Sequence, residues 1–146
     1  MTSEDGAVQN QDPVRLLVVD DEPHIGLLLR PHLEHVGYRV SLARTLGQAR
    51  HVLADAGAPV DALLLDLHLP DGSGLDLLRD LRGAAATRSL PVIVLTAEGE
   101  DRVLDEAQAL GSVLLTKPFS PTKLVARIAM LLRDASPPPR PLSESP

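Results

Sequence analysis

The sequence predicts an α/β protein with a doubly wound, five-stranded parallel sheet, and three observations support this class. Short apolar runs alternate along the chain with longer stretches in which apolar residues recur at helical spacing. Asp, Gly or Pro stands at the junctions between these segments. A helix of about a dozen residues between consecutive strands favours right-handed crossovers, which place the strands parallel and cover both faces of the sheet.

The predicted strands are five short apolar runs. Each run is bounded by Asp, Gly or Pro, which is typical of strands buried on both faces of a sheet. In chain order they cover residues 15–19, 39–42, 62–65, 91–95 and 112–116.

The predicted helices are the stretches that carry Leu, Val or Ala at helical spacing. In chain order they cover residues 24–36, 46–56, 75–82, 102–110 and 122–133. A glycine stands just past each of the first four helices, where a left-handed residue commonly ends a helix: Gly37, Gly57, Gly83 and Gly111. Ser120 and Pro121 supply a cap and a first-turn proline for the last helix.

The length of 146 residues fits one globular domain. We expect a disordered lead-in over residues 1–13, a folded domain over residues 14–133 and a proline-rich tail or linker stump over residues 134–146. The sequence has no cysteine, which excludes disulfides and thiolate metal sites and suits a cytoplasmic protein. A net charge of -6 and an aromatic content of 1% disfavour direct binding of nucleic acid or of a membrane surface, so we expect a protein partner.

Polar residues that could carry chemistry follow four of the predicted strands. Asp20 and Asp21 follow the first strand, Asp66 the third, Thr96 the fourth and Lys117 the fifth. Ligands of such sheets bind at the carboxyl ends of the strands, so we expect these side chains to converge. Three carboxylates packed together repel one another unless they share a cation, and oxygen ligands favour Mg²⁺ before Ca²⁺.

This set of groups is what phosphoryl transfer to a carboxylate requires. Asp66 can be the nucleophile, while the metal and the Lys117 ammonium neutralise phosphoryl oxygens and the Thr96 hydroxyl donates to one of them. The sequence contains no G-x-x-x-x-G-K-[ST] loop that would bind a nucleotide. The phosphoryl group must therefore come from another molecule.

Four motifs that carry these residues resemble, in order, the receiver domain of bacterial two-component response regulators. The motifs are VVDDEP (residues 18–23), LLLDLHLPDGSGLDLL (63–78), VIVLTAEGE (92–100) and LLTKPF (114–119). The resemblance spans roughly residues 14–133 and implies the flavodoxin-like (βα)5 receiver fold.

The resemblance implies that Asp20, Asp21 and Asp66 bind Mg²⁺, helped by the backbone carbonyl of His68. Asp66 would take a phosphoryl group from a histidine kinase or a histidine phosphotransfer protein, and family members also accept it from acetyl phosphate. Such a domain catalyses only its own phosphorylation and dephosphorylation, so we expect a signalling domain rather than an enzyme. Its output would be a contact with a downstream protein target or with a second copy of the chain.

The resemblance also implies which residues respond to the phosphoryl group. Thr96, with the small Ala97 beside it, and Lys117 would contact the group, and Pro118 would follow a cis peptide bond. The family usually carries Tyr or Phe three residues before the lysine, and this chain has Leu114 there. We therefore expect phosphorylation to move the loop after Thr96 and the start of the next helix, with little rearrangement around Leu114.

Two other classes of function fit parts of the sequence. A DNA-binding transcriptional response regulator would carry this domain as its input half, and it is disfavoured only if the chain is complete, because too few residues follow the last helix for a helix-turn-helix module. A Mg²⁺-dependent hydrolase of the haloacid dehalogenase type also forms an aspartyl phosphate. Such hydrolases show a D-x-D-x-T motif after the first strand, whereas this chain has the adjacent pair Asp20 and Asp21.

Overall fold

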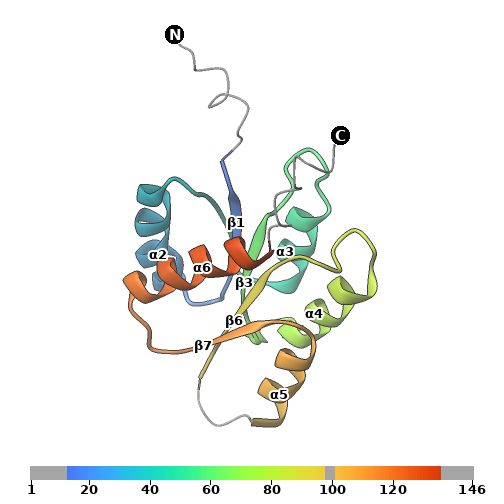
Figure 1. Ribbon diagram of the computed structural model, residues 1–146. Helices are drawn as coiled ribbons and strands as arrows, with labels where there is room; N and C mark the ends of the chain where they lie inside the picture. The colour runs from blue at the N-terminus through green and yellow to red at the C-terminus, as the bar shows by residue number, and fades with distance from the viewer. Residues whose placement is uncertain (1–12, 98–100, 136–146) are drawn as a thin grey trace, which may run out of the picture.

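A five-stranded sheet lies at the centre of the computed structural model, which describes residues 13–97 and 101–135 (Figure 1). Its strands are β1 (Arg15–Val19), β2 (Arg39–Ala43), β3 (Ala62–Asp66), β6 (Val92–Thr96) and β7 (Val113–Thr116). The order across the sheet is β2-β1-β3-β6-β7, and every neighbouring pair is parallel. The predicted class is confirmed, and the winding reverses between β1 and β3, where such sheets bind ligands.

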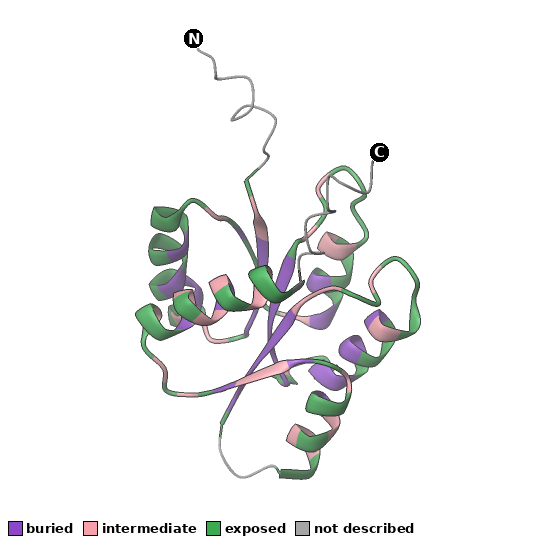
Figure 2. Cartoon of the chain, viewed as in Figure 1, coloured by how far each residue is buried: buried purple, intermediate pink, exposed green. Residues whose placement is uncertain are grey.

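Helices cover both faces of this sheet, as Figure 1 shows. One face is covered by α2 (Pro23–Val36) and α6 (Pro121–Ala135), and the other by α3 (Leu46–Leu53), α4 (Gly74–Gly83) and α5 (Asp101–Ala109). Because successive side chains of a strand point to opposite faces, each face has its own apolar cluster. The central strands β3 and β6 are buried along their whole length (Figure 2), which explains their uninterrupted apolar sequences.

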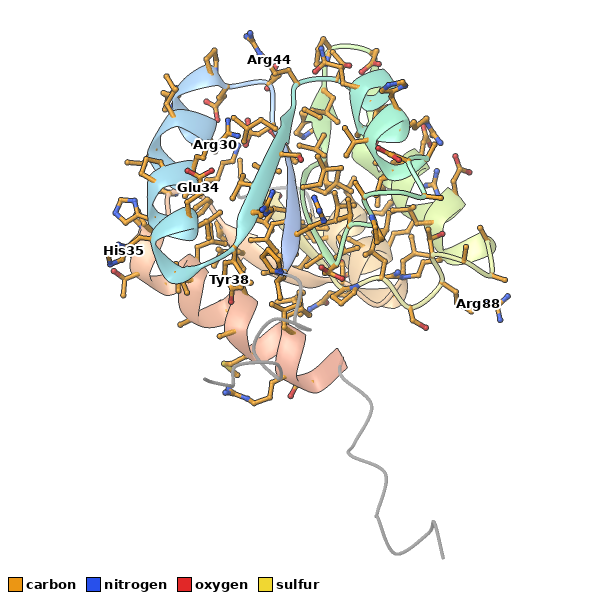
Figure 3. The ribbon with its side chains drawn as sticks, turned by 90° about the horizontal axis from the view of Figure 1, so that it is seen from above. Arg30, Glu34, His35, Tyr38, Arg44 and Arg88 are labelled. Atoms are coloured by element: carbon orange, nitrogen blue, oxygen red, sulfur yellow. The ribbon has the colours of Figure 1, made fainter. Side chains whose placement is uncertain are left out.

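The edge strand β2 is tied to α2 through Arg30. The Arg30 guanidinium donates to the Glu34 carboxylate at 3.1 Å and to the backbone carbonyl of Val40 at 3.1 Å. Figure 3 shows Arg30 and Glu34 together on this helix, beside the edge of the sheet. Arg30 therefore supplies a hydrogen-bond donor to a backbone carbonyl of β2, a strand at the edge of the sheet.

Several predicted bounds differ from the structure by a few residues. Asp66 and Thr96 end β3 and β6 instead of following them, because both residues still pair in register with the neighbouring strand. The helix predicted to end at Ala56 ends at Leu53. The Asp55 carboxylate accepts the backbone N–H of Gly57 at 2.9 Å, and this local turn competes with a further helical turn.

The glycine signals were right at two helix ends. Gly37 and Gly111 have φ values of 110° and 81°, in the left-handed region that favours glycine. Gly83 instead lies inside α4. The Leu81 carbonyl near the helix end accepts the backbone N–H of Ala84 at 3.4 Å and the Thr87 hydroxyl at 2.7 Å.

A short hairpin between β3 and α4 was not predicted. Its strands are β4 (His68–Leu69) and β5 (Gly72–Ser73), which pair antiparallel. Asp71 in the intervening turn accepts the backbone N–H groups of Leu46 and Gly47 at 2.8 and 3.0 Å. The hairpin therefore caps the N-terminus of α3.

The two predicted terminal segments fall largely outside the described residues, which leave out 1–12 and 136–146. Helix α6 continues to Ala135, two residues past the predicted boundary at 133. The next proline in the sequence is Pro137, and a proline disfavours helix only from the residue before it.

Candidate functional site

The carboxyl ends of four neighbouring strands meet at one edge of the sheet, and each brings a polar residue there. Asp20 follows β1, Asp66 ends β3, Thr96 ends β6 and Lys117 follows β7. Asp20, Asp66 and Thr96 are all buried. Because an unpaired buried polar group is costly, a cluster of them at the end of apolar strands indicates a functional site.

The carboxylates of Asp20, Asp21 and Asp66 form a group that could hold a metal ion. Their oxygen atoms lie within 4.8 Å of one another, and Asp21 is exposed while the other two are buried. The backbone N–H of Glu22 donates to Asp20 Oδ1 at 2.9 Å, and that of His68 donates to Asp66 Oδ1 at 3.1 Å. Oxygen donors in such an arrangement fit Mg²⁺, which is usually held by a few carboxylates and retained waters.

His68, predicted to assist through its backbone carbonyl, lies at the start of β4, two residues after Asp66. Its backbone N–H orients the Asp66 carboxylate, a contact that the sequence analysis did not foresee.

The Lys117 ammonium contacts three carboxylates at this site. Its Nζ atom lies 2.9 Å from Asp20 Oδ2, 3.0 Å from Glu22 Oε1 and 3.3 Å from Asp66 Oδ2. An ammonium has three hydrogens, so each of them has a carboxylate acceptor. Glu22 follows the acidic pair in the sequence, and only its distance to Lys117 in the fold reveals a role for it.

Charge and burial shift the pKa values of these groups. Burial raises the pKa of Asp20, although the hydrogen bond from Lys117 opposes this. Burial alone would lower the pKa of Lys117, but hydrogen bonds to the carboxylates of Asp20 and Glu22 outweigh it, so the net pKa is raised. The same hydrogen bond lowers the pKa of Glu22. Lys117 is therefore a fixed positive charge near neutral pH.

The ends of β6 and β7 are joined beside this group. The backbone N–H of Lys117 donates to the Thr96 carbonyl at 2.6 Å, and the peptide bond between Lys117 and Pro118 is cis. The Thr96 hydroxyl donates to the Ala97 carbonyl at 2.9 Å. A hydroxyl can rotate, so this group could instead donate to a ligand at the site.

Two further residues, Gly74 and Leu114, take part in the packing around the site. A Cβ atom on Gly74, at the start of α4, would lie 2.5 Å from the Asp66 carbonyl oxygen, so only glycine fits there without displacement. Leu114 is half-buried and packs against the apolar cluster that α5 joins through Val103 and Leu104.

The family model for the response regulator receiver domain matches residues 16–129. The chain belongs to the response regulator receiver family. Among curated relatives, this receiver domain is 39% identical over 123 residues to the phosphate regulon transcriptional regulatory protein PhoB of Pseudomonas aeruginosa, covering 84% of the chain and 53% of that protein. It is 40% identical over 136 residues to the transcriptional regulatory protein TrcR of Mycobacterium tuberculosis, covering 91% and 51%. The chain thus spans about half the length of these relatives.

Solved structures resemble the receiver domain over most of their length. A CheY-like receiver domain from Methanospirillum hungatei has a TM-score of 0.78 and 25% identity, covering 85% of this chain and 97% of that one. The receiver domain of a histidine kinase from Syntrophus aciditrophicus has a TM-score of 0.75 and 27% identity, covering 88% and 94%. Among the described residues of this receiver domain, no helix is both long and apolar enough to cross a membrane.

Proposed function

We propose that this receiver domain accepts a phosphoryl group on Asp66 from a histidine kinase or a histidine phosphotransfer protein and then signals through a contact with a protein target. The observation that supports this most is the position of Asp66, buried between the Asp20 and Asp21 carboxylates and the Lys117 ammonium. A carboxylate beside a fixed positive charge and a group of oxygen ligands is suited to attack phosphorus.

In the proposed step, an Asp66 carboxylate oxygen attacks the phosphorus atom of the donor. A P–O bond forms while the P–N bond to the donor histidine breaks, and the electron pair stays on the imidazole. Lys117 neutralises one phosphoryl oxygen, and the Thr96 hydroxyl turns from the Ala97 carbonyl to donate to another. The phosphoryl group ends on the domain itself, so we propose a signalling domain that catalyses only its own phosphorylation and dephosphorylation.

Asp20, Asp21 and Asp66 are the residues that would hold Mg²⁺. When bound there, the ion would neutralise charge on the phosphoryl oxygens during transfer. The buried pair, Asp20 and Asp66, is already oriented by the backbone N–H groups of Glu22 and His68.

Phosphorylation by acetyl phosphate tests this proposal. With Mg²⁺ and acetyl phosphate, we expect one phosphoryl adduct by intact mass, and Asp66→Asn should abolish it because no other carboxylate occupies its place. Asp71→Asn and Asp76→Asn are matched controls, since both carboxylates are exposed and lie in the hairpin turn and in α4. An adduct that persists in Asp66→Asn, or that maps to another residue, would contradict the assignment.

A second candidate is the input domain of a DNA-binding transcriptional regulator. It is favoured because the curated relatives named above are transcriptional regulatory proteins and the chain spans about half their length. Both candidates share the proposed chemistry at Asp66. Sequencing the gene beyond codon 146 separates them, since a DNA-binding domain would follow in the second case.

A further inference from the structure

The hydrogen-bonding capacity of the Lys117 ammonium is fully used in this structure. Its three hydrogens face carboxylate oxygens of Asp20, Glu22 and Asp66 at 2.9 to 3.3 Å. In the proposed function, a phosphoryl oxygen on Asp66 also needs this ammonium as a charge-assisted donor. The contacts of Lys117 must therefore rearrange when the phosphoryl group is attached.

The burial of the three acceptors indicates which contact is released most easily. The Asp20 side chain is 1% exposed, so losing the ammonium would leave a buried carboxylate without its cation. Asp66 lies farthest from Nζ, at 3.3 Å, and its carboxylate becomes part of the acyl phosphate, so this contact passes to the phosphoryl group. The Glu22 side chain is 45% exposed, so water can solvate its carboxylate as soon as Lys117 leaves.

We propose that Glu22 holds Lys117 in the unphosphorylated state and that Lys117 exchanges the Glu22 carboxylate for a phosphoryl oxygen on Asp66. The inference rests on the proposed function. Glu22 is a positioning residue that acts through Lys117, and its own position is set by its backbone, whose N–H donates to Asp20 Oδ1. Because it pairs with Lys117 in one state only, it favours the unphosphorylated state.

Removal of this competitor should strengthen binding of a phosphoryl analogue. We expect Glu22→Ala to lower the Kd for beryllofluoride at saturating Mg²⁺ by about 2-fold to 5-fold, the range expected of a partly exposed ion pair. Glu22→Gln removes the same charge but keeps an amide oxygen that accepts from Nζ, so its effect should be smaller. Titration followed by ¹⁹F NMR measures both affinities on the full chain.

A lysine signal reports the exchange independently of affinity. Lys117 and Lys123 are the lysines of this sequence, and Lys123 lies exposed on α6. With lysine-selective ¹⁵N labelling, beryllofluoride should shift the Lys117 resonance and leave that of Lys123 in place. Glu22→Ala should shift the Lys117 resonance before any analogue is added.

The outcomes separate this inference from the proposed function. An affinity in Glu22→Ala that is unchanged or weaker would overturn the inference, and so would equal tightening in the Ala and Gln variants, which indicates a general effect of charge. If the wild type itself binds no beryllofluoride, the proposed role of Asp66 fails as well. Circular dichroism of each variant confirms its fold, and we expect both to fold because the Glu22 side chain makes no capping bond to α2.

Discussion

At the scale of single residues, the candidate site carries more negative than positive charge. The Lys117 ammonium contacts Asp20, Glu22 and Asp66, and Asp21 lies close to the two aspartates. A buried carboxylate is destabilising unless a cation lies close to it, and one lysine does not balance four acids. A divalent cation would balance most of the remainder.

Addition of Mg²⁺ should therefore raise the unfolding midpoint of this domain. A ligand that binds only the folded state at about 100 times its Kd stabilises it by roughly 2.7 kcal/mol. Asp21→Ala should reduce the shift, since it removes the exposed ligand without disturbing the core. Thermal unfolding across a millimolar Mg²⁺ titration, at constant ionic strength, measures this.

The matched control for that titration is Asp105→Ala, which removes another exposed carboxylate, on α5. Its midpoint should rise with Mg²⁺ as in the wild type. A wild-type midpoint that does not respond to Mg²⁺ would show that the acidic group binds no divalent cation in this range.

The sequence predicted which strand-end residues would lie together at the site, but it did not predict every contact among them. Asp20, Asp66, Thr96 and Lys117 could be placed because each stands at the end of an apolar run, and parallel strands bring such ends together. Glu22 could not be assigned, since its role depends on a contact with a residue 95 positions away.

At the scale of elements, Asp71 connects the hairpin after β3 to the first turn of α3. Its carboxylate accepts two backbone N–H groups, from Leu46 and Gly47, while the Thr45 hydroxyl accepts that of Gln48. These contacts satisfy three of the free donors at the helix N-terminus. The hairpin could not be predicted from the sequence, because strands of two residues are too short to show an alternating apolar pattern.

Replacement of Asp71 should make stability depend less on pH. The N–H groups of Leu46 and Gly47 lower the pKa of Asp71, so its folded pKa lies below its unfolded one. Its contribution is complete above the unfolded value of about 4 and disappears as the pH falls through the folded pKa. Asp71→Asn should therefore lower the unfolding midpoint at pH 7, and the difference from wild type should shrink below pH 4.

Asp105→Asn again serves as the control, because this carboxylate is also exposed and lies outside the hairpin. Thermal unfolding between pH 2.5 and 7 gives both curves. A constant difference between Asp71→Asn and wild type over that range would show that the charge of Asp71 contributes nothing to the cap.

Strand and helix positions were predictable, but several ends were not. Buried strands have continuous apolar sequences, and β3 and β6 are the clearest cases. Helix ends depend on local hydrogen bonds instead. Asp55 and Thr87 make such bonds at the ends of α3 and α4, and the sequence alone does not show that their side chains reach the backbone.

At the scale of the whole molecule, the reversal of winding between β1 and β3 brings together residues that are distant in sequence. Asp20 and Lys117 contact each other across 97 positions. Alternation of strands and helices predicts this arrangement, since right-handed crossovers leave few other orders. How the sheet transmits a change at Asp66 to its surface is not encoded in that pattern.

We expect activation to alter the segment after Thr96 more than β7. Leu114 packs in the same apolar cluster as Val103 and Leu104, and an aliphatic side chain there offers no ring that could turn inward. Hydrogen exchange with and without beryllofluoride should therefore change over residues 97–103, of which 98–100 lie outside the described residues, and remain constant over 113–116.

Peptides from α3 provide the internal reference for that experiment, because α3 contacts neither segment through a described hydrogen bond. Changes confined to residues 113–116, with none over 97–103, would show that the signal travels along β7.

The close approach of Gly74 to the Asp66 carbonyl oxygen has a consequence for how this domain can evolve. Gly74 carries no functional group, yet substitutions there are as restricted as substitutions of the residues that would perform the chemistry. Any side chain at Gly74 would push the start of α4 away from β3. Solvent-facing positions of the same helix carry no such restriction. Selection for a new partner can therefore reshape the outer surface of α4 while its first residue stays fixed.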